Sequence, residues 1–296
     1  MESFLHDLSW VLPLRSDIAT PVFQAFTWAG YTTFYIILLA LGYWMLGKTV
    51  FARLAVLVGI SALINAFLKD FWQDPRPADA FRLDHAVGES YGMPSGHAQV
   101  SLTTWGFLAL SVRQTWAWIG AGIMIAGIAF SRLYLGVHDV EDILAGWAIG
   151  IVVLGAFVWF LRAHDHRWHN LHWSFQLVLL AILHGAAWFF WPGGPSEAFA
   201  ICALLAGWWL AVLADKNFIA FQPRSEWWAR GLSGLVGIIG LFALSAAWGK
   251  AAAAIGLGDI AAGYLRTLII ALYIGAIAPP LFQLMRLAEK KPEAAA

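Results

Sequence analysis

The feature of this sequence that most limits its fold is a succession of apolar runs separated by shorter polar segments. A helix needs about 20 apolar residues to cross the hydrocarbon core of a bilayer. Within lipid, only helices and closed barrels satisfy their own backbone polar groups. Runs of sufficient length lie at residues 25–46, 50–68, 96–113, 115–131, 140–161, 174–191, 198–214, 230–248 and 264–285. We therefore expect an all-α fold, a polytopic membrane bundle of about nine transmembrane helices.

The composition also indicates a membrane protein. Only 12% of the residues are charged and 60% are hydrophobic, whereas a soluble domain carries about 25% charged residues. The net charge is zero, which gives no basis for a nucleic-acid partner. The single cysteine, Cys202, lies in an apolar run, so an intrachain disulfide is excluded.

The first residues predict a segment that lies on the membrane surface. Residues 1–10 contain acidic side chains but no lysine or arginine, unlike the basic start of a secretory signal. The apolar residues recur at the spacing of an amphipathic interfacial helix, at Phe4, Leu5, Leu8, Val11 and Leu12.

The distribution of basic residues predicts the orientation in the membrane. The expected spans place two polar stretches, 69–97 and 132–138, on the same face, and 11 of the 18 basic residues fall on the opposite face. Cytoplasmic loops are enriched in lysine and arginine. The polar stretches are therefore expected to face away from the cytoplasm, toward the periplasm if the membrane is the inner membrane of a bacterium.

The polar stretch from Ser131 to Asp142, SRLYLGVHDVED, contains residue types suited to phosphate chemistry. His138 and Asp142 share one face of a helix if the chain is helical there, because they are four residues apart. A carboxylate bonded to one imidazole nitrogen fixes the tautomer and makes the other nitrogen a better nucleophile. Arg132 supplies a planar fork of donors that fits phosphate oxygens.

Two other polar stretches add parts of an anion site. Lys69 ends the second apolar run and is followed by Arg76, although a lysine at a helix end is also typical of the membrane interface. Pro94-Ser95-Gly96-His97 precedes the third run. Free amides at a helix start bind anions, although this sequence also fits a simple helix cap.

Together these residues supply what phosphoryl transfer needs: cations and amides around the oxygens, a nucleophile, and a proton donor. The sequence has no obvious carboxylate cluster for magnesium. Metal-free transfer through a phosphohistidine is the chemistry that remains.

The three stretches resemble the signatures of the type 2 phosphatidic acid phosphatase (PAP2) superfamily, which also contains glucose-6-phosphatase and the vanadium haloperoxidases. The matching residues are Lys69 with Arg76 and Pro77; Pro94, Ser95, Gly96 and His97; and Ser131 and Arg132 with His138 and Asp142. The resemblance covers about residues 60–165. It is to the membrane lipid phosphatases of the phosphatidylglycerophosphatase B type, and it implies a catalytic core of about six helices within residues 1–165. Residues 166–296 are then additional transmembrane helices packed on this core.

The resemblance also implies residue roles. His138 attacks phosphorus, Asp142 orients His138, and His97 protonates the leaving oxygen. The phosphate is held by Lys69, Arg76, Ser95, Gly96 through its amide, and Arg132. The family needs no metal and no other cofactor. Loops as long as 69–95 are usually functional, so this loop is expected to shape substrate access with residues such as Asp84, His85, Glu89 and Tyr91.

The function expected from these points is hydrolysis of a lipid phosphate or diphosphate, such as phosphatidic acid, phosphatidylglycerophosphate, a polyprenyl diphosphate or a sphingoid phosphate. Three alternatives stay open: a sugar-phosphate phosphatase of the glucose-6-phosphatase type, a lipid phosphotransferase, and a non-catalytic transporter or lipid-binding protein. The expected partners are the lipid phosphate, membrane lipids and, as a candidate, a second copy of the chain.

Overall fold

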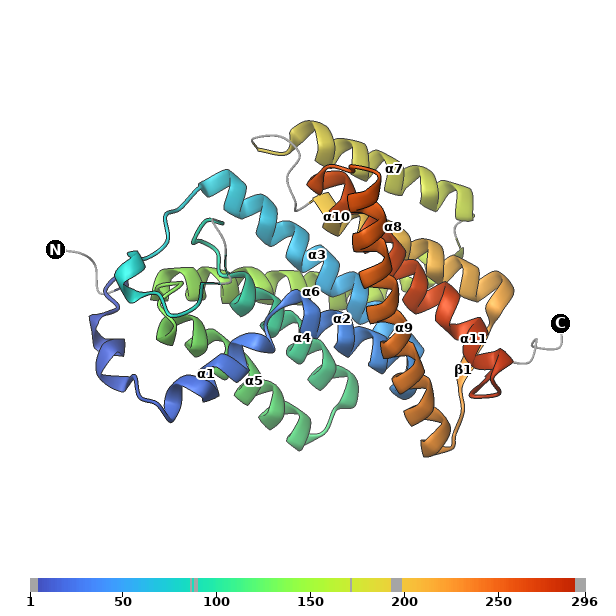
Figure 1. The fold of residues 1–296 in the computed structure, drawn as a ribbon, viewed down its shortest axis with the longest axis horizontal. Coiled ribbons are helices and arrows are strands. Elements are labelled where there is room, and N and C mark those ends of the chain that lie inside the picture. The colour runs from blue at the N-terminus through green and yellow to red at the C-terminus, as the bar shows by residue number, and fades with distance from the viewer. Residues whose placement is uncertain (1–4, 86, 88–89, 171, 193–198, 291–296) are drawn as a thin grey trace. The chain divides into compact units, whose positions relative to one another are not determined.

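The computed structural model describes residues 5–85, 87, 90–170, 172–192 and 199–290, with the side chains of 165–170 excepted. These residues are almost entirely helical (Figure 1), which confirms the expected all-α membrane fold. The small exception is a pair of antiparallel strands, β1 (Phe221–Pro223) and β2 (Ala288–Lys290).

The described residues contain seven helices that are long and apolar enough to cross a membrane, or up to eight if one bent pair counts as a span. The bent pair joins α1 (Ala19–Trp28) to Thr32–Leu46 at an angle of 61°. The expected count of nine is close but not reproduced. Residues 96–113 form α4 (Gly96–Val112), whose 17 residues lie at the lower limit for a helix that crosses a membrane.

The chain divides into two compact units, each described here by itself. Unit 1 comprises Met1–Tyr35 and Ile60–Asn170, and unit 2 comprises Ile36–Gly59 and Leu171–Ala296. The division expected from the sequence placed all of residues 1–165 in one part. The structure instead groups residues 36–59 with the C-terminal helices.

Unit 1 is a bundle in which α4 packs against both α5 and α6, and α1 packs against α5 (Figure 1). Its helices are η1 (Ser9–Leu14), α1, the C-terminal part of α3 (Lys48–Trp72), η3 (Asp79–Phe81), α4, α5 (Thr115–Tyr134) and α6 (Val140–Asn170). Polar side chains hold α4 to α3: the Gln99 amide donates to the Ser61 carbonyl at 2.8 Å, and the Asn65 amide donates to Gln99 Oε1 at 3.0 Å. Such pairs satisfy polar groups that lipid could not.

The described part of the N-terminal segment packs into unit 1, whereas Phe4 of the expected interfacial helix lies outside the described residues. This described part contains only the 3-10 helix Ser9–Leu14, which includes Pro13. Leu8 and Val11 are buried in a cluster with Leu133, Tyr134 and other apolar residues. These two side chains find protein partners, so they are not available to face lipid.

A tight turn connects α5 to α6. Gly136 has a φ of +69°, and a Cβ at this position would lie 1.9 Å from the Phe81 carbonyl oxygen. Only glycine fits such an approach. The turn is held from outside by Arg15, which donates to the carbonyls of Tyr134 at 3.1 Å and Phe81 at 2.6 Å.

Unit 2 contains the start of the long α3 and the C-terminal helices. They are part of α2 (Thr32–Leu41), η2 (Gly42–Leu46), α7 (Trp173–Phe190), α8 (Phe199–Ala214), η4 (Asp215–Ile219), α9 (Trp227–Ala254), α10 (Asp259–Leu272), η5 (Tyr273–Ile277) and α11 (Ala278–Leu284). The fully buried Trp44 donates to the Ile274 carbonyl at 2.8 Å, and Lys48 pairs with Asp215 at 2.7 Å. Residues 36–59 are thereby fixed within this unit.

Candidate active site

The three polar stretches meet in unit 1 at the ends of four helices. Lys69 lies in the last turn of α3, Arg132 in the last turn of α5, and Asp142 in the first turn of α6. Ser95 is the N-cap of α4, and its hydroxyl accepts from the Ala98 amide. Gly96 and His97 begin α4, while Arg76 and His138 lie in the connecting loops. All eight candidate site residues therefore belong to unit 1.

His138 and Asp142 form a buried hydrogen-bonded pair. His138 Nδ1 lies 2.7 Å from Asp142 Oδ2, and the side chains are each 2% exposed. A carboxylate on Nδ1 places the proton there and leaves Nε2 with a lone pair. His138 Nε2 lies 3.3 Å from Arg76 Nη1, which marks the direction in which this nitrogen faces.

Asp142 is positioned by a reciprocal capping box at the start of α6. The Asp142 amide donates to Asp139 Oδ1 at 3.0 Å, and the Asp139 amide donates to Asp142 Oδ2 at 3.3 Å. This arrangement satisfies two amides that a helix start otherwise leaves unpaired. The Asp142 oxygen that accepts from Asp139 is also the one bonded to His138.

Arg76 and Lys69 are held by backbone carbonyls rather than by carboxylates. Arg76 donates to the carbonyls of Ser90 at 2.5 Å and Val137 at 2.6 Å. Lys69 Nζ donates to the Gly92 carbonyl at 2.8 Å and to the Tyr91 carbonyl. These carbonyls orient the two side chains without pairing either of them to a carboxylate.

Arg132 is 1% exposed and meets a second group of residues that the motifs do not contain. Its Nη1 donates to Asp84 Oδ2 at 2.9 Å and to the Thr27 hydroxyl. The Tyr31 hydroxyl donates to the same Asp84 oxygen at 2.5 Å. Asp84 therefore orients Arg132 directly.

His97 is packed edge-on against Tyr31, with ring centroids 5.0 Å apart. Its buried Nε2 has no hydrogen-bond partner among the described residues. Gly30 makes room for the ring: a Cβ at residue 30 would lie 2.2 Å from His97 Cδ2.

The electrostatics of the site favour an anion and a neutral nucleophile. Burial, together with the charges of Lys69, Arg76 and Arg132, holds the pKa of His138 well below its usual value. Within the described residues, two more buried site atoms lack a hydrogen-bond partner besides His97 Nε2, namely Arg132 Nε and Asp142 Oδ1. Buried polar atoms of this kind are normally satisfied, so they are available to a bound group.

A polar hollow of about 540 Å³ adjoins Arg76. It is lined by residues 74–79, Arg82, Ser90 and Tyr91. Arg76 is the candidate site residue in this lining, and it also lies 3.3 Å from His138 Nε2 through its Nη1. In the described part of the chain, no group of three or more His, Cys, Asp or Glu side chains is placed to hold a metal ion.

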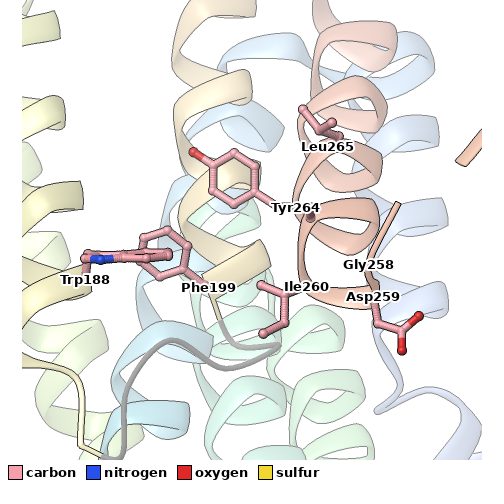
Figure 2. A pocket seen from close by; sticks show the side chains of 8 residues that line it. Trp188, Phe199, Gly258, Asp259, Ile260, Tyr264 and Leu265 are labelled. Carbon is pink, nitrogen blue, oxygen red and sulfur yellow. The ribbon is translucent and has the colours of Figure 1, made fainter. Parts of the chain in front are cut away.

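A larger, apolar hollow of about 680 Å³ lies in unit 2. Figure 2 shows Trp188, Phe199 and Tyr264 around it, from α7, α8 and α10. The Tyr264 hydroxyl lies 2.7 Å from His184 Nε2. None of the candidate site residues lines this hollow.

Sequence reasoning missed several residues that contact the site. Thr27, Tyr31 and Gly30 lie far from the motifs in the chain, and only the fold brings them to His97 and Arg132. Asp139 carried a detectable signal, because an acidic residue three positions before another is the spacing of a capping box. Of the loop residues expected to shape substrate access, Glu89 lies outside the described residues.

Fold and site together define a polytopic helical membrane protein with a His–Asp pair among buried cationic side chains. Residues 50–166 match the family described as "PAP2 superfamily", and residues 199–290 match "PAP2 superfamily phosphatase, transmembrane extension". The chain therefore contains a PAP2 superfamily domain and the transmembrane extension of a PAP2 superfamily phosphatase.

Three known proteins illustrate the similarity. The chain is 24% identical over 180 residues to dihydrosphingosine 1-phosphate phosphatase of Saccharomyces cerevisiae, covering 56% of this chain and 45% of the relative. It is 31% identical over 128 residues to phosphatidylglycerophosphatase B of Bacillus subtilis, covering 40% and 62%. The crystal structure of the PAP2-type phosphatidylglycerolphosphate phosphatase of B. subtilis superposes with a TM-score of 0.46 at 24% identity, covering 53% of this chain and 83% of that chain. The matches with the two relatives span less than two thirds of each relative's length.

Proposed function

We propose that the protein is a metal-independent membrane phosphatase that hydrolyses a lipid phosphate or lipid diphosphate through a phosphohistidine intermediate. The observation that carries this proposal is the buried His138–Asp142 pair, whose second imidazole nitrogen faces Arg76. The three cations Lys69, Arg76 and Arg132 supply the charge that neutralises phosphate oxygens during transfer.

The reaction has two steps in this proposal. In the first, His138 Nε2 forms a bond to phosphorus while the bond from phosphorus to the leaving oxygen breaks, and His97 gives that oxygen a proton. In the second, water attacks phosphorus, the P–N bond breaks, and His97 takes a proton from the water. Inorganic phosphate is released, and His97 is ready to act again as the acid.

The candidate substrates are phosphatidic acid, phosphatidylglycerophosphate, polyprenyl diphosphates and sphingoid phosphates. Two of these classes are supported by the names of the relatives from S. cerevisiae and B. subtilis. The polar hollow beside Arg76 is a candidate position for the head group, because polar side chains such as Arg82 and Ser90 line it. The site faces the periplasm of a bacterial inner membrane in this proposal, as the distribution of basic residues favours.

Phosphate release by the detergent-purified full chain tests the proposal. The panel holds phosphatidic acid, phosphatidylglycerophosphate, undecaprenyl diphosphate, sphingosine phosphate and glucose 6-phosphate, each with and without EDTA. We expect EDTA-resistant release from at least one lipid. Release that EDTA abolishes would refute the metal-independent route, and a preference for glucose 6-phosphate would refute the lipid substrate.

Substituting Gly30 by alanine is expected to lower kcat for phosphate release by about 10²-fold, because misplacing a catalytic group by about 1 Å has such an effect. The new Cβ would overlap the His97 ring, which has to move. Gly122→Ala is the matched control, since a Cβ there meets nothing within 4 Å. Equal kcat values for the two variants would contradict the assigned position of His97.

A further inference from the structure

His6 lies against the acidic residues that follow His138. Its Nδ1 is 2.7 Å from Asp139 Oδ2, and its Nε2 is 3.0 Å from Glu141 Oε2. A neutral imidazole has only one N–H group, so both nitrogens can donate together only in the doubly protonated ring. The geometry is therefore that of an imidazolium held between two carboxylates.

Hydrogen bonds connect His6 to the candidate nucleophile through Asp139. One Asp139 oxygen accepts from His6, and the other accepts from the Asp142 amide in the capping box. Asp142 in turn binds His138 Nδ1 at 2.7 Å. The Asp139 and Asp142 carboxylates are thus each held by two hydrogen-bond partners.

The segment that carries His6 is itself anchored. The Leu5 carbonyl accepts from the Val140 amide at 3.0 Å, which satisfies a further free amide at the start of α6. Leu8 and Val11 are 2% and 0% exposed. His6 is therefore held at Asp139 by its neighbours and not by its own two contacts alone.

We propose that His6, in its doubly protonated form, is a positioning residue that fixes Asp139 and thereby holds Asp142 on His138. This inference rests on the proposed function, in which His138 is the nucleophile. His6 does not touch the substrate in this proposal. It sets the fraction of molecules in which the His–Asp pair has its productive geometry.

The proposal implies a pH dependence with a defined sign. The hydrogen bond and charge of Asp139, with smaller contributions from Glu141 and Asp74, raise the pKa of His6. The contact between doubly protonated His6 and Asp139 is then fully formed below the ordinary histidine pKa of about 6.5. It weakens as the pH rises through the raised value, so kcat is expected to fall on the alkaline side.

The kinetic test compares His6→Gln and His6→Lys with the wild type and with His172→Gln, which removes another exposed histidine. We expect His6→Gln to lower kcat at pH 6.5 by about three- to tenfold, the usual effect of losing a supporting hydrogen bond, with little change in KM. This variant is also expected to lose the alkaline fall of kcat. Lysine stays charged to about pH 10, so His6→Lys is expected to move the fall to higher pH.

A wild-type pH profile and kcat in both His6 variants would overturn the proposal. A second readout needs no turnover: the ¹⁵N NMR signals of the His6 ring, assigned by their loss in His6→Gln. Both nitrogens should be protonated at pH 6.5, and a singly protonated ring would overturn the proposal. If the wild type releases no phosphate, the proposed function fails instead, and the ¹⁵N signals still report on the protonation of the His6 ring.

Discussion

Substituting His138 by glutamine is expected to abolish phosphate release, with a fall in kcat of at least about 10⁴-fold, because the nucleophile is lost. Glutamine keeps a polar side chain of similar length but cannot form a phosphorylated nitrogen of this kind. The measurement is kcat on the best lipid of the panel, together with trapping of the phosphorylated protein in base, where phosphohistidine is stable. The wild type should retain labelled phosphate from the substrate, and the His138→Gln variant should not.

The depressed pKa of His138 sharpens this expectation. Because burial and three cations keep the imidazole neutral, the wild type should still form the phosphorylated intermediate at mildly acidic pH. His184→Gln is the matched control, since His184 is also hydrogen-bonded but lies in unit 2. Labelled phosphate on His138→Gln, or its absence from His184→Gln, would contradict the assignment of His138 as the nucleophile.

Substituting Asp142 by asparagine is expected to lower kcat by about 10³- to 10⁴-fold, the size of effect seen when a carboxylate that orients a catalytic histidine is made neutral. The amide has no negative charge to keep the proton on Nδ1, so His138 Nε2 loses its lone pair in part of the molecules. KM should change little, because Lys69, Arg76 and Arg132 are untouched. The measurement is the rate of phosphoenzyme formation in a single turnover.

The control for this variant is Asp259→Asn, which makes the same change in the first turn of α10. Removing a carboxylate at a helix start lowers stability by about 1 kcal/mol or less. The control separates this loss of stability from a loss of catalytic rate. Both variants should have similar thermal stability. A slow Asp259→Asn enzyme, or a fast Asp142→Asn enzyme, would contradict the role of Asp142.

The helical membrane fold could be predicted because it depends on local sequence, and the meeting of the three motifs could be expected because the spans return them to one membrane face. Apolar length gives the spans, and the spacing of His138 and Asp142 places them on one helical face. The exact count of nine spans was not confirmed, although seven or eight among the described residues is close. Residues 25–46 break at a 61° bend, and α4 ends after 17 residues.

The surroundings of the motifs could not be predicted, because their contacts join distant parts of the chain. Asp84 meets Arg132 across 48 positions and His6 meets Asp139 across 133. Residues 1–12 looked like a helix for the lipid surface, since the apolar spacing of Leu8 and Val11 does not reveal whether lipid or protein covers them. In the structure, Leu8 and Val11 are covered by protein, whereas Leu5 and Leu12 of the same pattern are exposed.

The grouping of residues 36–59 with the C-terminal helices limits how this gene can be divided. The partners of Trp44 and Lys48 are Ile274 and Asp215, encoded far downstream of them. A cut between the two family matches, after residue 166, would yield an N-terminal fragment that carries Trp44 and Lys48 without these partners. Each unit is built from two separate segments of the sequence, so neither unit is continuous in the chain. An exchange of unit 2 between proteins would therefore have to include residues 36–59 as well as residues 171–296.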